Sequence, residues 1–99
     1  MLKILMSWDI VPSKEKDFLD FLLQDFTPAV QKLGIQPTDA WLTVYGRGPQ
    51  VLAGGIVDDD AAAFSILASD EWRSLEQRLL KMVTNYRRRV IQAEGGFQL

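Results

Sequence analysis

Six residues of this chain have side chains suited to contact a small ligand. They supply hydroxyl groups, aromatic rings and one guanidinium, which orient ligands through hydrogen bonds, stacking and charge. The set is Ser7, Trp41, Thr43, Tyr45, Tyr86 and Arg88. Trp41, Thr43 and Tyr45 alternate along one segment, so we expect them to share one face of a strand. Such aromatic residues most often pack an interface, and lining a ligand pocket is the alternative role.

Two residue types that carry much of enzyme chemistry are missing. The 99 residues include no His and no Cys. The chain therefore lacks the commonest general base, the usual haem ligand and any thiolate nucleophile or Cys-ligated metal site. No Ser can act through a Ser–His–Asp triad. We expect neither a bound metal nor a cofactor.

The only run of basic residues is Arg87–Arg89. Strand alternation would place Arg88 on the same face as Tyr86 and its two neighbours on the other. We expect a solvated strand edge, with the alternative that an inward Arg88 pairs with a carboxylate or an anionic ligand. The formal net charge of −2 argues against a nucleic-acid partner.

Two acidic features favour structural interpretations. Asp58–Asp60 are consecutive, and successive strand side chains point in opposite directions, so the three carboxylates cannot easily converge on one cation. We expect them to begin a helix, where negative charge is favourable. Ser7 and Asp9 share a strand face and are expected to form a buried, hydrogen-bonded polar pair.

Alternating apolar residues or β-branched content predict four strands. They are 2–10, 40–45, 51–57 and 86–93, with a hairpin connection over 46–50. Gly54 and Gly55 inside the third strand indicate a bulge or a close approach of another backbone or ligand. The charged last strand is typical of a sheet edge.

Helical periodicity predicts a long first helix over 13–33 that ends at Gly34 and kinks at Pro28. Its apolar arc comprises Phe18, Leu19, Leu22, Leu23, Phe26, Ala29, Val30 and Leu33, and Phe21 falls outside it. A short helix is predicted over 61–68. Ser69 is expected to cap another helix, which ends at Asn85. That helix carries the apolar stripe Trp72, Leu75, Leu79, Met82 and Val83.

This order of elements predicts an α+β, ferredoxin-like βαββαβ domain over residues 1–99, with a four-stranded antiparallel sheet and both helical units on one face. The helix-facing positions are expected to be Ile4, Met6, Trp8, Ala40, Leu42 and Val44. The open face would carry Leu5, Ser7, Trp41, Thr43 and Tyr45. We expect that face to be apolar and therefore to be covered by a second copy in a homodimer. An RNA-binding version of this fold is disfavoured, since the third strand lacks the aromatic residues that stack bases.

The segments FTPAVQKLGI (26–35) and LASDEWRSLEQRLLKMVTNYRRRVI (67–91), with the order of elements, resemble the dimeric α/β-barrel proteins. The NIPSNAP-type and stress-responsive barrel branches are the most similar. The resemblance implies two sheets that face each other across a two-fold axis and close a barrel-like interior. Relatives in this superfamily include antibiotic-biosynthesis monooxygenases and haem-degrading enzymes. The haem-degrading enzymes hold iron through a His that this chain lacks.

Two functions follow from these expectations. The first is a homodimeric domain, expected in the cytoplasm, that binds a small apolar or aromatic molecule or serves as an assembly module. The alternative is a cofactor-independent monooxygenase-like enzyme acting on an aromatic or apolar molecule in the barrel cavity. Its candidate side chains are Trp8, Trp41, Tyr45 and Tyr86. The apolar stretches of the chain are too short to cross a membrane. Nucleic acid and membranes are not expected as partners.

Overall fold

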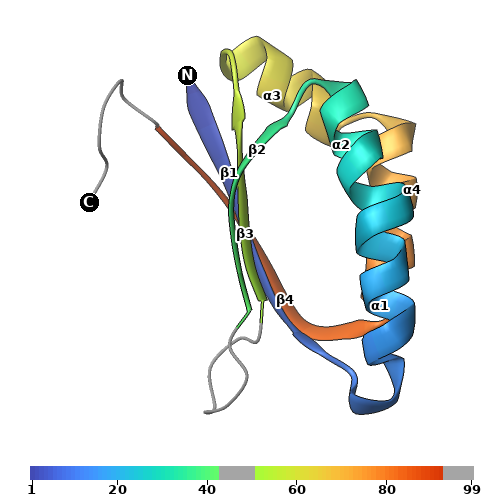
Figure 1. Ribbon diagram of the computed structural model, residues 1–99. Helices are drawn as coiled ribbons and strands as arrows, with labels where there is room; N and C mark the ends of the chain where they lie inside the picture. Colours follow the sequence, from blue (N-terminus) through green and yellow to red (C-terminus); the bar gives the residue numbers. More distant parts are fainter. Residues whose placement is uncertain (43–50, 93–99) are drawn as a thin grey trace.

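A four-stranded antiparallel sheet forms one layer of the molecule, and helices form the other (Figure 1). The computed structural model describes residues 1–42 and 51–92, with the side chains of Asp39, Trp41 and Leu42 excepted. The strands are β1 (Leu2–Ile10), β2 (Gln36–Leu42), β3 (Val51–Val57) and β4 (Val83–Gln92). Their spatial order is β2-β3-β1-β4, so β2 and β4 are the edge strands of the described sheet. The predicted α+β, ferredoxin-like fold is confirmed.

Strand β1 has the alternating pattern that its sequence predicts. Every second residue from Leu2 to Ile10 is buried against the helices, and the residues between them are half-buried on the other face. Strand β1 lies between β3 and β4, with Ile4 opposite both Gly55 and Val90. A central strand with one apolar face fixes the register, because a one-residue slip would turn that face away from the core.

The first helical segment is a rod with an inserted wide turn. It consists of a 3-10 turn η1 (Pro12–Lys14), α1 (Glu15–Phe21), a π-helical turn η2 (Leu22–Phe26) and α2 (Thr27–Leu33). The Thr27 N–H donates to the Leu22 carbonyl, five residues back. The interruption predicted as a kink at Pro28 is therefore a π turn that ends just before this proline. Pro28 has no N–H to continue the ladder of hydrogen bonds.

The π turn corrects the predicted apolar arc of the first helix. Phe21, placed outside the arc by a uniform helical period, is 6% exposed, whereas Leu23 is 71% exposed and Leu19 46%. An extra residue in the turn rotates the following helix, so residues five apart come onto one face. The rings of Phe21 and Phe26 accordingly lie 5.8 Å apart between centroids.

Side-chain caps begin the two later helices, α3 (Asp60–Leu67) and α4 (Asp70–Leu80). Asp59 Oδ1 accepts from the Ala62 N–H at 2.8 Å, and Ser69 Oγ accepts from the Trp72 N–H at 3.2 Å. The helix-initiating role predicted for the Asp58–Asp60 run and the predicted cap at Ser69 are both confirmed. Within the described residues, no group of acidic side chains is arranged to hold a metal ion. No helix in the described part of the chain has the length and apolarity needed to span a membrane.

Two predicted strand boundaries were wrong. Helix α4 ends at Leu80, so Met82 and Val83 follow the helix and β4 starts three residues before Tyr86. Asn85 lies inside β4 with a φ of 56°, where it accommodates the irregular pairing with β1. Strand β2 starts at Gln36, four residues earlier than predicted. Its predicted end at residue 45 and the 46–50 hairpin lie outside the described residues.

The predicted close approach in the third strand occurs at Gly55. A Cβ atom there would lie 2.4 Å from Ile35 Cγ2 and 3.2 Å from the Gln36 carbonyl oxygen. Opposite it, the pairing of β2 with β3 shifts register between Pro37 and Asp39. The glycine therefore lets the turn after α2 pack directly on the sheet.

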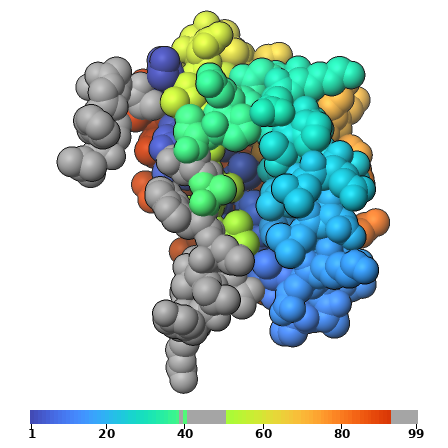
Figure 2. Space-filling model, viewed as in Figure 1, coloured from blue at the N-terminus to red at the C-terminus, as the bar shows by residue number. Residues whose placement is uncertain are grey.

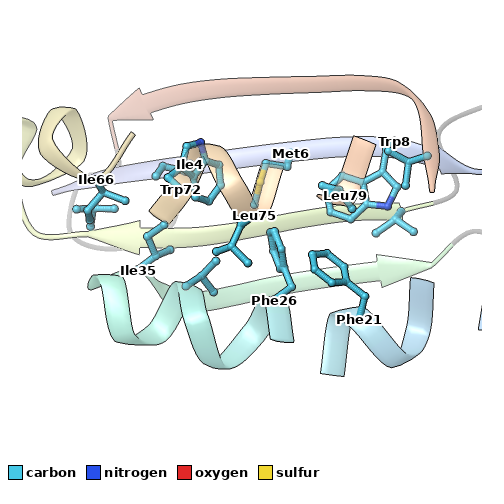
Figure 3. Close-up of a cluster of buried hydrophobic side chains, with 14 of the residues drawn as sticks. Ile4, Met6, Trp8, Phe21, Phe26, Ile35, Ile66, Trp72, Leu75 and Leu79 are labelled. Carbon is cyan, nitrogen blue, oxygen red and sulfur yellow. The ribbon is translucent and has the colours of Figure 1, made fainter. Parts of the chain in front are cut away.

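The core lies between the helices and one face of the sheet (Figure 3). Strand β1 contributes Ile4, Met6 and Trp8, as predicted, and all three are at most 5% exposed. Facing them are the aromatic rings of the first helical segment and of α4. Trp8 packs edge-on against Phe18, with ring centroids 5.8 Å apart. This core fixes the positions of the side chains described below.

Candidate functional site

The six residues predicted to contact a ligand do not gather in one place. Ser7 is half-buried on the open face of the sheet, whereas Tyr86 and Arg88 point towards the helices. Trp41 belongs to β2, but its side chain is not among those described. Thr43 and Tyr45 lie outside the described residues. The members that can be placed therefore occupy opposite faces of the sheet.

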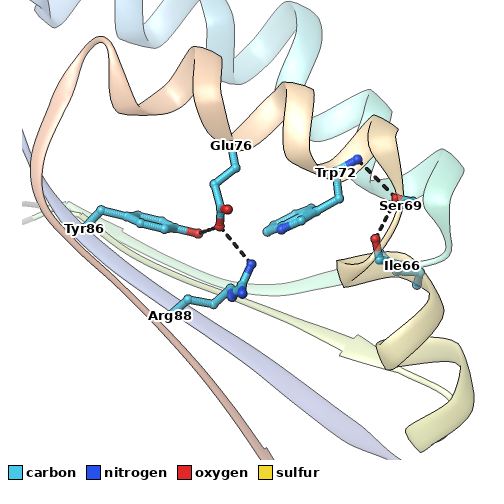
Figure 4. Close-up of polar contacts among 6 residues, drawn as sticks. All are labelled: Ile66, Ser69, Trp72, Glu76, Tyr86 and Arg88. Carbon is cyan, nitrogen blue, oxygen red and sulfur yellow. Dashed lines mark hydrogen bonds and ion pairs between the residues drawn. The ribbon is translucent and has the colours of Figure 1, made fainter.

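Tyr86 and Arg88 share one carboxylate partner on the helix side (Figure 4). The Tyr86 hydroxyl donates to Glu76 Oε2 at 2.6 Å, and Arg88 Nη1 donates to the same oxygen at 2.9 Å. The Arg88 guanidinium also lies 5.8 Å from the centroid of the Trp72 ring. These contacts realise the alternative in which an inward Arg88 pairs with a carboxylate. They join the middle of β4 to α4.

Glu76 was not identified from the sequence. It lies four residues after Trp72 on α4, which is the spacing of neighbours on one helix face. This spacing places Glu76 on the buried face of α4, and strand alternation places Tyr86 and Arg88 on one face of β4. Together these two patterns are the sequence signal that could have paired Glu76 with Tyr86 and Arg88.

The environment keeps the Tyr86 hydroxyl neutral. Burial raises the pKa of this phenol well above its usual value, and the hydrogen bond to the Glu76 carboxylate raises it further. The nearby Arg88 opposes both effects but does not outweigh them. At neutral pH the Tyr86 hydroxyl is therefore a hydrogen-bond donor and not a base.

An apolar pocket opens between the helical rod and the β2 edge of the sheet. Figure 2 views this edge, with β2 in green in front of the sheet and the rod in cyan and blue beside it. The pocket has a volume of about 100 Å³. It is lined by Met6, Leu22, Phe26, Thr27, Val30, Ile35, Pro37, Ala40, Ala53, Gly54 and Gly55. Among the described residues of this lining, Thr27 supplies the one polar side chain, so the pocket suits an apolar group.

The π turn and Gly55 both shape this pocket. Leu22 and Phe26 are the first and last residues of η2, and they form part of the wall on the helical side. Gly55 forms part of the opposite wall, where a larger residue would collide with Ile35. Two irregularities, one in a helix and one in the sheet, thus meet at the same place.

The open face of the sheet is more polar than predicted. Leu5, Ser7 and Leu52 line a depression of about 220 Å³ there, together with Arg87 and Arg89. The two arginines are the strand neighbours of Arg88, so alternation turns them away from the helices. The expected aliphatic residues are present, but charged side chains surround them.

The predicted Ser7–Asp9 pair is not a buried pair. Both residues are half-buried on the open face, and the described residues include no buried polar side chain. Asp9 Oδ2 accepts from Asn85 Nδ2 at 2.8 Å. Asp9 therefore helps to hold the bulge in β4 beside β1.

Comparisons with solved structures reveal the same fold in several proteins. An uncharacterised NIPSNAP domain protein from Burkholderia xenovorans is 15% identical, with a TM-score of 0.71 and 99% of each chain covered. HapK from Hahella chejuensis is 13% identical, with a TM-score of 0.76 over 100% of this chain and 99% of that one. A candidate antibiotic biosynthesis monooxygenase from Nitrosomonas europaea is 6% identical, with a TM-score of 0.70 over 95% and 99%.

Neither a protein-family model nor a functionally curated protein matches this sequence. The identities to the solved structures are low, so these similarities establish a shared fold. The predicted resemblance to NIPSNAP-type and monooxygenase-like proteins is thereby confirmed at the level of the fold.

Proposed function

We propose that this protein is a homodimeric domain that binds a small apolar molecule. The observation that carries the binding function is the apolar pocket between the helical rod and β2. Its volume of about 100 Å³ is below the range of typical ligand sites, about 300–1,000 Å³. The pocket therefore suits a compact group such as a single ring or a short alkyl chain. An unfilled apolar cavity destabilises a core, so an apolar occupant would stabilise the fold.

Binding of benzene tests this function. The binding is measured by the melting temperature of the protein and by the NMR signal of the Met6 methyl group. Met6 lines the pocket, so we expect benzene to shift its methyl resonance and to raise the melting temperature. Ala53→Leu places a larger side chain at the pocket wall and should abolish both effects. Ala61→Leu, at an exposed position on α3, is the control and should leave them unchanged. No methyl shift in the unmodified protein would contradict the proposal.

The proposed dimer pairs the open faces of two sheets. Support comes from the one-sided helical layer and from Leu5, Leu52 and Ile56, which lie at open-face positions of the central strands. Leu52 is 37% exposed, so its side chain is available to a second copy. Self-association through one shared patch gives two-fold symmetry, the commonest arrangement of homodimers. We further propose that Ser7, Trp41, Thr43 and Tyr45 contribute to this inter-sheet region.

A pair of matched substitutions tests which surface forms the dimer. Leu52→Glu places a carboxylate in the proposed interface, and we expect a folded monomer in light scattering after gel filtration. Leu23→Glu is the control. Leu23 is exposed on the helical rod, so we expect the protein with this substitution to remain dimeric. A dimeric Leu52→Glu protein, or a monomeric Leu23→Glu protein, would place the interface elsewhere.

A cofactor-independent monooxygenase-like activity on an apolar molecule is the second candidate function. It is favoured by the fold shared with the Nitrosomonas europaea protein that is named as a candidate antibiotic biosynthesis monooxygenase. The Tyr86 hydroxyl already donates its one proton to Glu76, so it would orient a substrate or intermediate by accepting a hydrogen bond. Recovery of the bound molecule unchanged under oxygen supports binding alone, whereas an oxygenated product supports the enzyme.

The lack of Cys agrees with a reducing compartment, and we propose a cytoplasmic location.

A further inference from the structure

The part of the open face formed by β1 and β4 has a charge opposite to that of the whole chain. The formal net charge of the chain is −2. At the described open-face positions of β1 and β4, however, Lys3, Arg87 and Arg89 supply three cations and Asp9 the one carboxylate. Asp9 already accepts a hydrogen bond from Asn85. Positive charge is therefore concentrated on β1 and β4 at the face that the helices leave uncovered.

Arg87 and Arg89 differ from the arginines on the helical side of the sheet in their ion pairs. Arg78 pairs with Asp25 at 2.6 Å, Arg88 with Glu76 at 2.9 Å and Arg73 with Asp70 at 4.0 Å. Each of these three guanidiniums on the helical side therefore has a carboxylate partner. Within residues 1–42 and 51–92, neither Arg87 nor Arg89 forms an ion pair. Two guanidiniums that have no ion-pair partner among the described residues thus lie two residues apart on one face of β4.

The register places these arginines beside apolar side chains. Ser7 is paired with Arg87 on one side and with Leu52 on the other, and Leu5 is paired with Arg89. Residues two apart on a strand are separated by about 6.7 Å, a distance that two long side chains can close around one anion. The depression there, about 220 Å³, is lined by Leu5 and Leu52 together with Arg87 and Arg89.

We propose that this depression binds a small amphiphilic carboxylate. Arg87 and Arg89 would hold the carboxylate by charge-assisted hydrogen bonds, and the apolar body would lie over Leu5 and Leu52. This inference rests in part on the proposed dimer, because pairing two open faces would remove these guanidiniums from water. Burying charges without partners is strongly unfavourable, and a bound anion in each copy supplies the partner.

Binding of octanoate, measured by titration calorimetry, tests the proposed site. Acetate has the charge without the apolar body, and 1-octanol has the apolar body without the charge. We expect octanoate to bind at least about tenfold more tightly than either of them. Equal affinity for acetate would reduce the site to simple charge attraction, and equal affinity for 1-octanol would reduce it to an apolar surface. Either result would overturn the proposal.

Arginine variants locate the site. We expect Arg87→Gln and Arg89→Gln each to weaken octanoate binding about tenfold, with circular dichroism unchanged because both residues are exposed. Arg73→Gln makes the same change of charge on the exposed side of α4 and should bind octanoate as the unmodified protein does. Octanoate binding that survives both substitutions would overturn the proposal.

Sedimentation of the same samples separates this inference from the proposed dimer. If octanoate binding depends on Arg87 and Arg89 while the chain stays monomeric, the anion site stands and the dimer proposal fails. If the chain is dimeric and neither arginine affects octanoate binding, the dimer stands and the anion site fails. A carboxylate of the partner copy would then be the counter-charge. If both hold, octanoate should shift the equilibrium towards the dimer.

Discussion

At the scale of single residues, the most constrained polar group is the Tyr86 hydroxyl. Its hydrogen bond to Glu76 crosses from β4 to α4, and Arg88 contacts the same carboxylate oxygen. A carboxylate that accepts two donors in a half-buried position is well satisfied, so this cluster fastens the edge strand to the helical layer. It also fixes which face of β4 turns inwards.

The raised pKa of Tyr86 predicts a loss of stability in alkaline solution. In the unfolded chain this phenol ionises near pH 10, whereas in the folded protein it stays neutral. Above pH 10 the folded state therefore binds more protons than the unfolded state, and stability falls as pH rises. At pH 7 we expect Tyr86→Phe to cost about 1 kcal/mol through the lost hydrogen bond.

Urea unfolding of the unmodified protein and of Tyr86→Phe at pH 7, 10 and 11 measures this effect. The stability difference between them should narrow above pH 10, by at most about 1.4 kcal/mol per pH unit, because the variant has no phenol to ionise. Other titrating groups are common to both proteins and cancel. A difference that stays constant from pH 7 to pH 11 would contradict the raised pKa.

At the scale of elements, the π turn decides which side chains of the first helical segment reach the core. Phe21 is buried and Leu23 is 71% exposed, although both are large apolar residues on the same helix. The same turn supplies Leu22 and Phe26 to the apolar pocket. The candidate ligand site thus depends on this local irregularity.

Alanine substitutions at these two positions test the π turn. Phe21→Ala empties a packed position in the core and should cost about 3–5 kcal/mol of unfolding free energy. Leu23→Ala should change it by no more than about 0.5 kcal/mol, as is usual for exposed positions. A uniform α-helix predicts the reverse order, so urea denaturation of the two variants separates the two structures.

The elements with a strong local signal could be predicted from the sequence, and the irregular ones could not. The alternation of β1 and the cap at Ser69 are local patterns, and both are present as expected. The π turn depends on how Pro28 fits the following helix and on packing against distant rings, which a uniform period of 3.6 residues does not include. The early start of β4 depends on Asn85 adopting a positive φ, which local propensity rarely indicates.

The candidate sites were predictable only in part for a related reason. Strand parity correctly grouped Tyr86 with Arg88 and separated Arg88 from its neighbours. Their partner Glu76 lies on a different element, α4. Its contact with Tyr86 and Arg88 therefore depends on how α4 packs on the sheet. The apolar pocket needs both the π turn and the close approach at Gly55, and neither its shape nor its lining follows from local pattern.

At the scale of the whole molecule, the two faces of the sheet have different roles. One face holds the core (Figure 3), and the apolar pocket lies between this face and the helices. The other carries Leu5 and Leu52 beside two arginines without carboxylate partners in the described residues. A surface of this mixed kind fits an interface that needs an anion better than it fits the purely apolar interface expected from the sequence.

The pairing of two open faces is tested most directly by sedimentation equilibrium of the unmodified protein at micromolar concentration, with and without octanoate. We predict a species of twice the 11.2 kDa mass of the chain, with the dimer favoured further when octanoate is present. A single 11.2 kDa species under both conditions would contradict the proposed homodimer.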